Sequence, residues 1–358
     1  MLTTMSPAGL DRWRARVRDR LRDFHDAPAS HVAIHCGGNT QPCWAGLHRT
    51  RRACSHTSTK GLEGTHPCWH VSSQKRVRTD PGHQWSTTMA KSVLMCRPEH
   101  FAIHYEINPW MDLECPVCPD AAARQWEALY QLYTETLGWE VHLIPPVEGF
   151  PDMVFTANGA LVVGDKVALP TFRHPERQGE TWWFESWLRE QGFTVLYQPR
   201  HDFEGEGDAL IWNDTLFAGY PWRSDQAAHA ELASFLDLEV VSLQLTDARF
   251  YHLDTAFTVV DHQTVALYPP AFTHESLEAV RHRVPNVIEA NEADALAYGL
   301  NAVSDGERIV LSDRATGLAE RYRQHGMEVH LVAIDEFQKS GGGMKCLTLD
   351  LKGRLQGR

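Results

Sequence analysis

The chain has 358 residues and is acidic overall, with 34 Lys and Arg against 46 Asp and Glu. A hydrophobic content of 43% is that of a globular protein with a sizeable core. No apolar run approaches the roughly 20 residues that a membrane helix needs, and the N-terminus has no apolar stretch of signal-peptide type. We therefore expect neither a membrane protein nor a secreted one.

The balance of basic and acidic residues changes near residue 89. Residues 1–88 carry 13 Lys and Arg against 6 Asp and Glu, whereas residues 89–358 carry 21 against 40. We expect residues 1–88 to be a disordered basic extension and residues 89–358 to form one folded domain. The acidity of that domain disfavours nucleic acid and suits a cationic small substrate.

Two alternatives stay open for the basic extension. Translation could begin at Met89, which would account for the break in composition. The extension could instead be a zinc or nucleic-acid module built on Cys43, Cys54, Cys68 and His70. That hypothesis is weakened because these residues include no C-x₂-C pair, which zinc modules normally contain.

From residue 92 onward, short strands and helices are predicted in a fixed order. An apolar strand at 92–96 precedes a helix that ends at Gly138 and a strand at 139–145. Four further units each begin with a hairpin and continue with a helix and a third strand. The hairpins are expected at 153–170, 208–220, 255–269 and 300–312. The helices are expected at 181–192, 225–237, 275–284 and 315–326, and the third strands at 193–199, 238–245, 286–290 and 327–334.

This order is a β-β-α-β unit that occurs five times, with a spacing of about 40–50 residues. Such a repeat predicts an α+β ring with five-fold pseudo-symmetry (an α/β propeller), with strands inside and helices outside. The first unit lacks a hairpin, because the irregular segment 99–112 stands in its place. A last strand at 345–351 could return to the first unit and close the ring. The alternative is an ordinary α/β sheet.

Polar residues interrupt the apolar pattern at the beginning of each of several units. If the units are related by rotation, these positions face one central channel. They are Asp152 and Asn158 in unit two, Glu204, Glu206 and Asp208 in unit three, His252 and Asp254 in unit four, and Cys346 after unit five.

These residue types suit chemistry on a planar cation. Carboxylates can hold a guanidinium, and a thiolate at Cys346 can attack its central carbon. His252 can donate a proton to the departing amine and then accept one from water. Asp254, two residues along the same predicted strand, would face the same side as His252. A single cysteine in an apolar strand is also a common core residue, so this alternative stays open.

A five-fold ring with the stretch "EGEGD", a later H-x-D and a cysteine near the C-terminus resembles the pentein superfamily of guanidino-group-modifying enzymes. The likeness covers residues 92–353. The opening "MCRPEHFAIHYEINPWMD" is most similar to the branch of dimethylarginine dimethylaminohydrolases and arginine dihydrolases. The resemblance implies a pentein fold and a catalytic domain at 89–358. It also implies hydrolysis of arginine or a methylated arginine through a covalent thiouronium, without a metal or organic cofactor.

The resemblance also implies roles for individual residues. Cys346 matches the nucleophile, His252 the general acid and base, and Glu204 the acid that binds guanidinium and orients the imidazole. "EGEGD" is one residue longer than the family's E-G-G-D, so Glu206 and Asp208 compete with Glu204 for that role, and we favour Glu204. The implied substrate-binding residues are Asp152, Asp254, Asn108, Asn158, Arg177 and Arg223. Of these, the two arginines are candidates for the substrate α-carboxylate or for surface salt bridges. Asn108 matches a residue associated with a second hydrolysis, from citrulline to ornithine.

Two alternatives to a hydrolase remain at this point. An amidinotransferase would share the same residues and pass the amidino group to an amine, and a pentein-fold binding protein would have no catalysis at all. The expected partner is a small guanidino compound, with no nucleic acid and no membrane, and a homo-oligomeric state stays open. The cysteines of the main domain show no disulfide framework, which favours the cytoplasm.

Overall fold

The computed structural model describes residues 91–351 of the chain. The predictions for residues 1–88 lie outside this range. Within it, no helix has both the length and the apolar character that crossing a membrane requires.

The described residues form five sheets of three strands each. In every sheet the first two strands are antiparallel and the third is parallel to the second. The sheets are β15 (Leu349–Asp350), β1 (Ser92–Cys96) and β2 (Glu140–Ile144); β3 (Leu161–Val163), β4 (Lys166–Ala168) and β5 (Val195–Tyr197); β6 (Ala209–Trp212), β7 (Thr215–Tyr220) and β8 (Glu239–Gln244); β9 (Phe257–Asp261), β10 (Thr264–Leu267) and β11 (Asn286–Glu289); and β12 (Val303–Ser304), β13 (Arg308–Ser312) and β14 (Glu328–Val332).

The last strand closes the ring, as the sequence predicted. β15 pairs antiparallel with β1, with Val93 opposite Asp350 and Leu94 opposite Leu349. It therefore occupies in the first sheet the place that β3, β6, β9 and β12 occupy in the other four. The missing hairpin of the first unit is completed by the far end of the chain.

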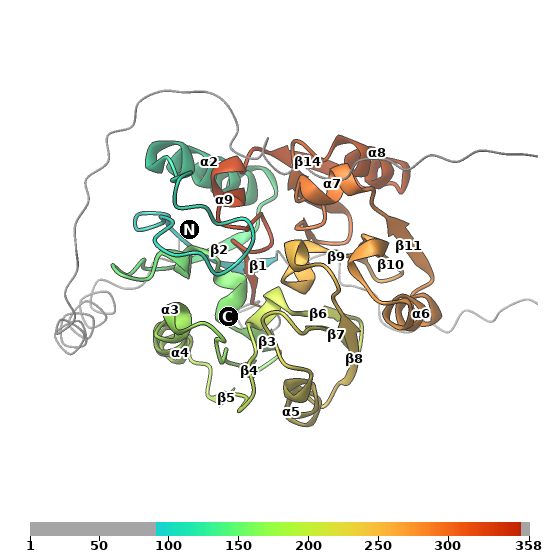
Figure 1. Ribbon diagram of the computed structural model, residues 1–358, viewed down its shortest axis with the longest axis horizontal. Coiled ribbons are helices and arrows are strands. Elements are labelled where there is room, and N and C mark those ends of the chain that lie inside the picture. The colour runs from blue at the N-terminus through green and yellow to red at the C-terminus, as the bar shows by residue number, and fades with distance from the viewer. Residues whose placement is uncertain (1–90, 352–358) are drawn as a thin grey trace, which may run out of the picture. The chain divides into compact units, whose positions relative to one another are not determined.

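Helices connect the second strand of each unit to the third and lie on the outside of the ring (Figure 1). They are α2 (Pro119–Gln131, continued by a π-helical turn at Leu132–Thr136), α4 (Glu180–Glu190), α5 (Gln226–Leu236), α6 (His274–Arg283) and α8 (Thr316–Gln324). The structure adds three short helices that the sequence pattern did not predict, α3 (Pro175–Gln178), α7 (Glu292–Leu296) and α9 (Asp335–Gln338).

Helix α4 illustrates why these segments fold as predicted. Its buried residues Trp183, Phe184, Trp187 and Leu188 recur at helical spacing and pack into one apolar cluster with strand residues of the first two sheets. Burying a large apolar side chain contributes roughly 1.5–3 kcal/mol, so this stripe fixes the helix against the sheets. Gly192, at φ 88°, ends the segment because glycine adopts this backbone conformation without steric cost.

The inner strands are short, and each is preceded by a turn that carries polar residues. Asn158, Glu206, Asp254 and Cys346 each lie three residues before the first strand of a sheet. The 3₁₀ turn that holds Asn158 contacts the turn at Gly205–Gly207, which in turn contacts the one that holds Asp254. The pseudo-symmetry thus gathers these turns at one end of the ring.

Two details of the sequence prediction are wrong. Asp254 lies in a 3₁₀ turn at Leu253–Thr255, so the two-residue period of a strand does not place it beside the imidazole of His252. Cys346 does not lie in a strand either, because β15 begins only at Leu349. In both cases the polar residue takes part in the turn, and the strand starts after it.

Candidate active site

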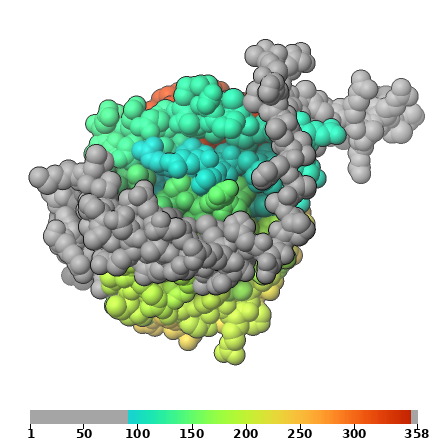
Figure 2. Space-filling view, turned by 90° about the vertical axis from the view of Figure 1, so that its left-hand side faces the viewer, coloured from blue at the N-terminus to red at the C-terminus, as the bar shows by residue number. Residues whose placement is uncertain are grey.

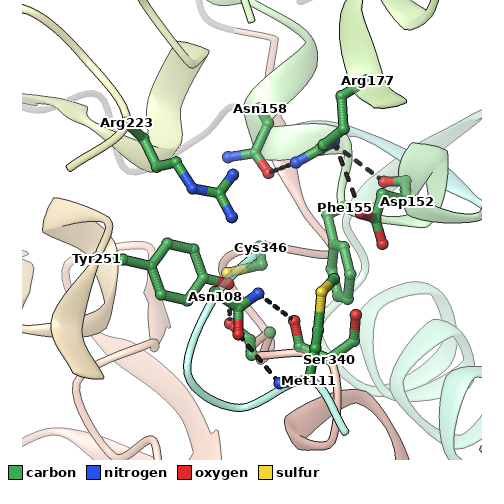
Figure 3. A pocket seen from close by; sticks show the side chains of 12 residues that line it. Asn108, Met111, Asp152, Phe155, Asn158, Arg177, Arg223, Tyr251, Ser340 and Cys346 are labelled. Atoms are coloured by element: carbon green, nitrogen blue, oxygen red, sulfur yellow. Dashed lines mark hydrogen bonds and ion pairs between the residues drawn. The ribbon is translucent and has the colours of Figure 1, made fainter. Parts of the chain in front are cut away.

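A small cavity lies where these turns meet (Figure 3). Its volume is about 10 Å³, which is room for about one water molecule. An arginine-sized molecule therefore requires the walls to move apart. The walls include Cys346, Asp152, Asn108, Asn158, Arg177, Arg223, Tyr251 and the backbone at 340–342.

Cys346 lies at the cavity with its sulfur beside an acid. Its side chain is 2% exposed, and its Sγ lies 3.4 Å from Oδ2 of Asp254. Burial and the negative charge of Asp254 raise the pKa of the Cys346 thiol well above its ordinary value. Burial also raises the pKa of Asp254, to about 7. The thiol of the free protein is therefore protonated at neutral pH.

His252, Glu204 and Arg223 form a second group of contacting side chains, of which Arg223 lines the cavity. Oε2 of Glu204 lies 2.8 Å from Nε2 of His252 and accepts a hydrogen bond of 2.9 Å from Nη1 of Arg223. Burial alone would raise the pKa of Glu204, but the charges of Arg223 and His252 hold it well below its usual range. Glu204 therefore stays a carboxylate and anchors the imidazole.

The other two acids of "EGEGD" have different partners. Glu206 accepts hydrogen bonds from Nζ of Lys345 at 2.5 Å and from the backbone N–H of Asp350 at 2.9 Å. Asp208 accepts from the Ser224 hydroxyl at 2.6 Å and from the Leu253 N–H at 3.0 Å. Of the three, Glu204 contacts His252, which is the contact that the role of orienting acid requires.

Arg177 is buried and is bound on several sides. Its guanidinium donates to both carboxylate oxygens of Glu180, at 2.9 and 2.8 Å, to Oδ1 of Asn158 at 2.9 Å and to the backbone oxygen of Asp152 at 3.2 Å. The exposed fractions of Arg177 and Arg223 are 2% and 3%, so the alternative of surface salt bridges is wrong for both.

Three carboxylate oxygens of the predicted site residues have no partner among the described residues. They are Oδ1 of Asp152, Oε1 of Glu204 and Oδ1 of Asp254, and all three are buried. A buried acceptor without a hydrogen bond costs about 1–3 kcal/mol, so the folded chain alone leaves this site incomplete. A planar cation with several N–H groups is the chemical complement of such a set.

The segment after β1 forms part of the cavity wall through Asn108 and is hydrogen-bonded to two other wall residues. Nδ2 of Asn108 donates to the backbone oxygen of Ser340 at 3.1 Å, and Oδ1 accepts from the Trp110 N–H at 2.9 Å. The backbone oxygen of Ile107 accepts a hydrogen bond of 3.1 Å from Arg223. Figure 2 shows the blue and cyan beginning of the described chain at the surface, between teal and green residues.

The sequence model described as "N,N dimethylarginine dimethylhydrolase, eukaryotic" matches residues 97–352. A Mycobacterium tuberculosis protein named N(G),N(G)-dimethylarginine dimethylaminohydrolase is 46% identical over 265 residues, which cover 74% of this chain and 87% of that protein. The chain belongs to the dimethylarginine dimethylhydrolase family.

Other relatives of this dimethylhydrolase-family chain are larger or more distant. The bifunctional arginine dihydrolase/ornithine cyclodeaminase ArgZ of Synechocystis is 42% identical over 263 residues, which cover 72% of this chain but 37% of ArgZ. The solved N-terminal domain of an ArgZ cysteine-to-serine mutant, bound to substrate, is 40% identical with a TM-score of 0.70, over 74% of this chain and 98% of that domain. A dimethylarginine dimethylaminohydrolase structure from Pseudomonas aeruginosa shares the fold at 19% identity, with a TM-score of 0.63 over 73% of this chain and 99% of that chain.

These findings confirm the pentein fold and the class of activity. The chain is a cysteine-dependent hydrolase of C–N bonds in the guanidino group, and its substrate is a small guanidino compound. Within residues 91–351, no group of three or more His, Cys, Asp or Glu side chains could hold a metal ion.

The predicted catalytic residues of this chain form two separate contact groups. The imidazole of His252 bonds Glu204, while the sulfur of Cys346 contacts Asp254, and no hydrogen bond within the described chain joins the imidazole to the sulfur. Arg223 and Cys346 line the same cavity, so a ligand there would lie between the two groups.

The three glycines before Cys346 let the backbone pack tightly against side chains of the site. A Cβ at Gly342 would lie 2.1 Å from the ring of Phe155, and one at Gly343 would lie 2.6 Å from Oδ1 of Asn301. Gly341, at φ 82°, has a backbone conformation that L side chains rarely adopt. Asn301 is a site residue that the sequence prediction missed.

Proposed function

We propose that this chain hydrolyses the guanidinium of free arginine, with Cys346 as nucleophile and His252 as proton carrier. Asp152, Glu204 and Asp254 would hold the cation. The observation that supports this proposal is the set of three buried carboxylate oxygens that have no hydrogen-bond partner among the described residues.

The chemistry would proceed in two halves. Binding of the guanidinium beside Asp254 offsets the negative charge there, so that the thiol proton passes to solvent and Sγ of Cys346 attacks the central carbon. A C–S bond forms, the bond to one terminal nitrogen breaks, and His252 gives that nitrogen a proton so that it leaves as ammonia. His252 then takes a proton from water and the hydroxide adds to the thiouronium carbon. The C–S bond breaks as the new hydroxyl group gives its proton to the departing sulfur, which releases citrulline and restores the Cys346 thiol.

Arg223 is better placed than Arg177 to bind the α-carboxylate of the substrate. The hydrogen bonds of Arg223 to Glu204 and Ile107 use two of the five N–H groups of an arginine. Arg177 already makes four, with Glu180, Asn158 and Asp152 as partners. We propose that Arg177 fixes Asp152 and Asn158, and that Arg223 contacts the substrate.

A second hydrolysis, from citrulline to ornithine, is the finer proposal. It is supported by Asn108 and Asn158 at the cavity and by the 42% identity to a protein named as an arginine dihydrolase. A methylated arginine is the second candidate substrate, which the family match and the Mycobacterium tuberculosis relative favour.

Separate incubations with arginine, asymmetric dimethylarginine and agmatine test these proposals. Ornithine with two ammonia per arginine would establish the dihydrolase, and citrulline with one would establish a deiminase. If dimethylamine forms from dimethylarginine while arginine stays intact, the substrate is a methylated arginine and not arginine. Added glycine that is converted to guanidinoacetate would indicate an amidinotransferase instead.

The cellular location, the partners and the oligomeric state of the protein remain predictions. They are a cytoplasmic location, the absence of a nucleic-acid partner, and an oligomeric state still to be measured. Sedimentation of the full chain with and without RNA tests the last two, because binding to the basic extension would weaken steeply with salt.

A further inference from the structure

The fifth turn of the ring carries a buried polar residue, Asn301. It lies two residues before β12, one position from the place that Asn158, Glu206, Asp254 and Cys346 occupy in the other four sheets. Its side chain is fully buried. The five-fold repeat therefore puts a polar group at the one unit for which the sequence pattern predicted none.

The side-chain amide of Asn301 is bound to the nucleophile on two sides. Its Nδ2 lies 3.1 Å from Sγ of Cys346 and 3.1 Å from the backbone oxygen of Asp254. Its Oδ1 accepts a hydrogen bond of 3.1 Å from the backbone N–H of Cys346. One side chain thus contacts both the sulfur and the backbone of the same cysteine.

These partners fix which end of the amide faces the sulfur. The backbone N–H of Cys346 can only donate, and the backbone oxygen of Asp254 can only accept. The oxygen of the Asn301 amide must therefore point to the N–H, and its NH₂ group to the Asp254 oxygen and to Sγ. The sulfur faces a hydrogen-bond donor on one side and the carboxylate of Asp254 on the other.

We infer that Asn301 is a catalytic hydrogen-bond donor that stabilises the thiolate of Cys346 and fixes the direction from which it attacks. Asp254 accepts the thiol proton's hydrogen bond but repels the thiolate, whereas the Asn301 N–H favours the charged sulfur more than the neutral one. This inference depends on the proposed role of Cys346 as nucleophile.

The surroundings keep Asn301 in this orientation. Its backbone oxygen accepts from the Lys345 N–H at 3.3 Å, and its backbone N–H donates to Tyr298 at 3.2 Å. Gly343 leaves no room for a side chain against the amide. The donor is therefore held in place before substrate arrives, which is the condition for electrostatic stabilisation without reorganisation.

Asn301→Asp tests the inference, because it keeps the oxygen that accepts the Cys346 N–H and replaces the donor by an acceptor. The readouts are kcat and the rate at which iodoacetamide alkylates the Cys346 peptide in the free chain, followed against pH by mass spectrometry. We expect kcat to fall about 10²-fold, as for the loss of one preorganised donor. We also expect the midpoint of alkylation to move to higher pH, while the high-pH plateau rate, which reports access, stays unchanged.

The matched control is Asn286→Asp. Asn286 is exposed on β11 and its side-chain amide donates a long hydrogen bond, of 3.5 Å, to the Thr264 hydroxyl, so kcat and the alkylation midpoint should equal those of the wild type. Asn301→Ser retains a donor and should fall between wild type and Asn301→Asp. An unchanged midpoint in Asn301→Asp, or unfolding of both Asn301 variants by circular dichroism, would overturn the inference. Full turnover by Cys346→Ser would instead overturn the proposed function itself.

Discussion

Two buried acids of the site, Glu204 on the side of the His252 imidazole and Asp254 on the side of the Cys346 sulfur, have pKa values shifted in opposite directions. Glu204 faces the guanidinium of Arg223 and stays ionised, with its pKa well below the usual range. Asp254 faces a sulfur, and its pKa is raised to about 7 mainly by burial. The difference shows that the carboxylate on the imidazole side already forms an ion pair with Arg223, whereas Asp254 on the sulfur side has no cation in an ion pair with it among residues 91–351. The substrate guanidinium would supply that cation.

The largest expected effect tests whether the sulfur side is where the covalent chemistry occurs. Cys346→Ser should lower kcat by about 10⁴-fold or more, because a serine hydroxyl in this environment is not a competent nucleophile. The fold should be retained, since the two side chains differ by one atom. Product formation from arginine, with circular dichroism as the check on folding, measures both. Wild-type turnover would show that another residue attacks the guanidinium carbon.

The imidazole side can be tested with two acids from one turn. Glu204→Gln should lower kcat by about 10²-fold or more, because it removes the charge that anchors His252 and Arg223. Glu206→Gln, the matched control, should lower turnover far less and instead destabilise the fold by about 3 kcal/mol, because it leaves Lys345 without its buried partner. The measurements are steady-state kinetics and urea unfolding. Equal losses of turnover would mean that the acids do not have separate roles.

Replacing Asp254 should change the reactivity of the Cys346 thiol and the rate of turnover in opposite directions. In the free chain, alkylation of Cys346 should accelerate as pH rises, because burial and Asp254 disfavour the thiolate. Asp254→Asn removes the negative charge and should move the alkylation midpoint to lower pH, while turnover falls because a substrate-binding acid is lost. A midpoint that moves to higher pH would contradict this account of the sulfur side.

A smaller effect is expected at Asn108, in the segment after β1. Asn108→Ala removes the hydrogen bonds to Ser340 and Trp110 at the cavity wall. We expect the first hydrolysis to continue and the product to accumulate as citrulline instead of ornithine. Chromatography of amino acids after complete consumption of arginine measures the ratio. An unchanged ornithine yield would remove Asn108 from the second step.

Local sequence signals predicted most of the ring, and they failed where polar residues form turns. The apolar run of β1, the stripe of α4 and the glycine stops after α2 and α4 all carry strong periodic or backbone signals. Asp254 and Cys346 were placed in strands because apolar neighbours follow them, whereas in the structure the turn comes first. Asn301 was read as the start of a hairpin. Comparing equivalent positions across the five units would have revealed it.

The sequence prediction missed three helices for the same reason. α3, α7 and α9 contain four or five residues each, too few to show a helical period. The sequence also did not predict which site residues contact one another. Those contacts depend on the directions of side chains within turns, which the spacing of residues in the sequence does not give. For this reason the sequence left Arg177 open between the substrate and a surface salt bridge, although Glu180, its buried partner, follows three residues later.

Trapping the covalent intermediate tests the central claim most directly. Arginine turnover is quenched with acid within one catalytic cycle, the protein is digested, and the peptide that contains Cys346 is weighed. We expect that peptide to carry the thiouronium adduct, with a lifetime that lengthens when His252 is replaced by alanine. An adduct on another residue, or none on Cys346 while citrulline is being formed, would contradict attack by this sulfur.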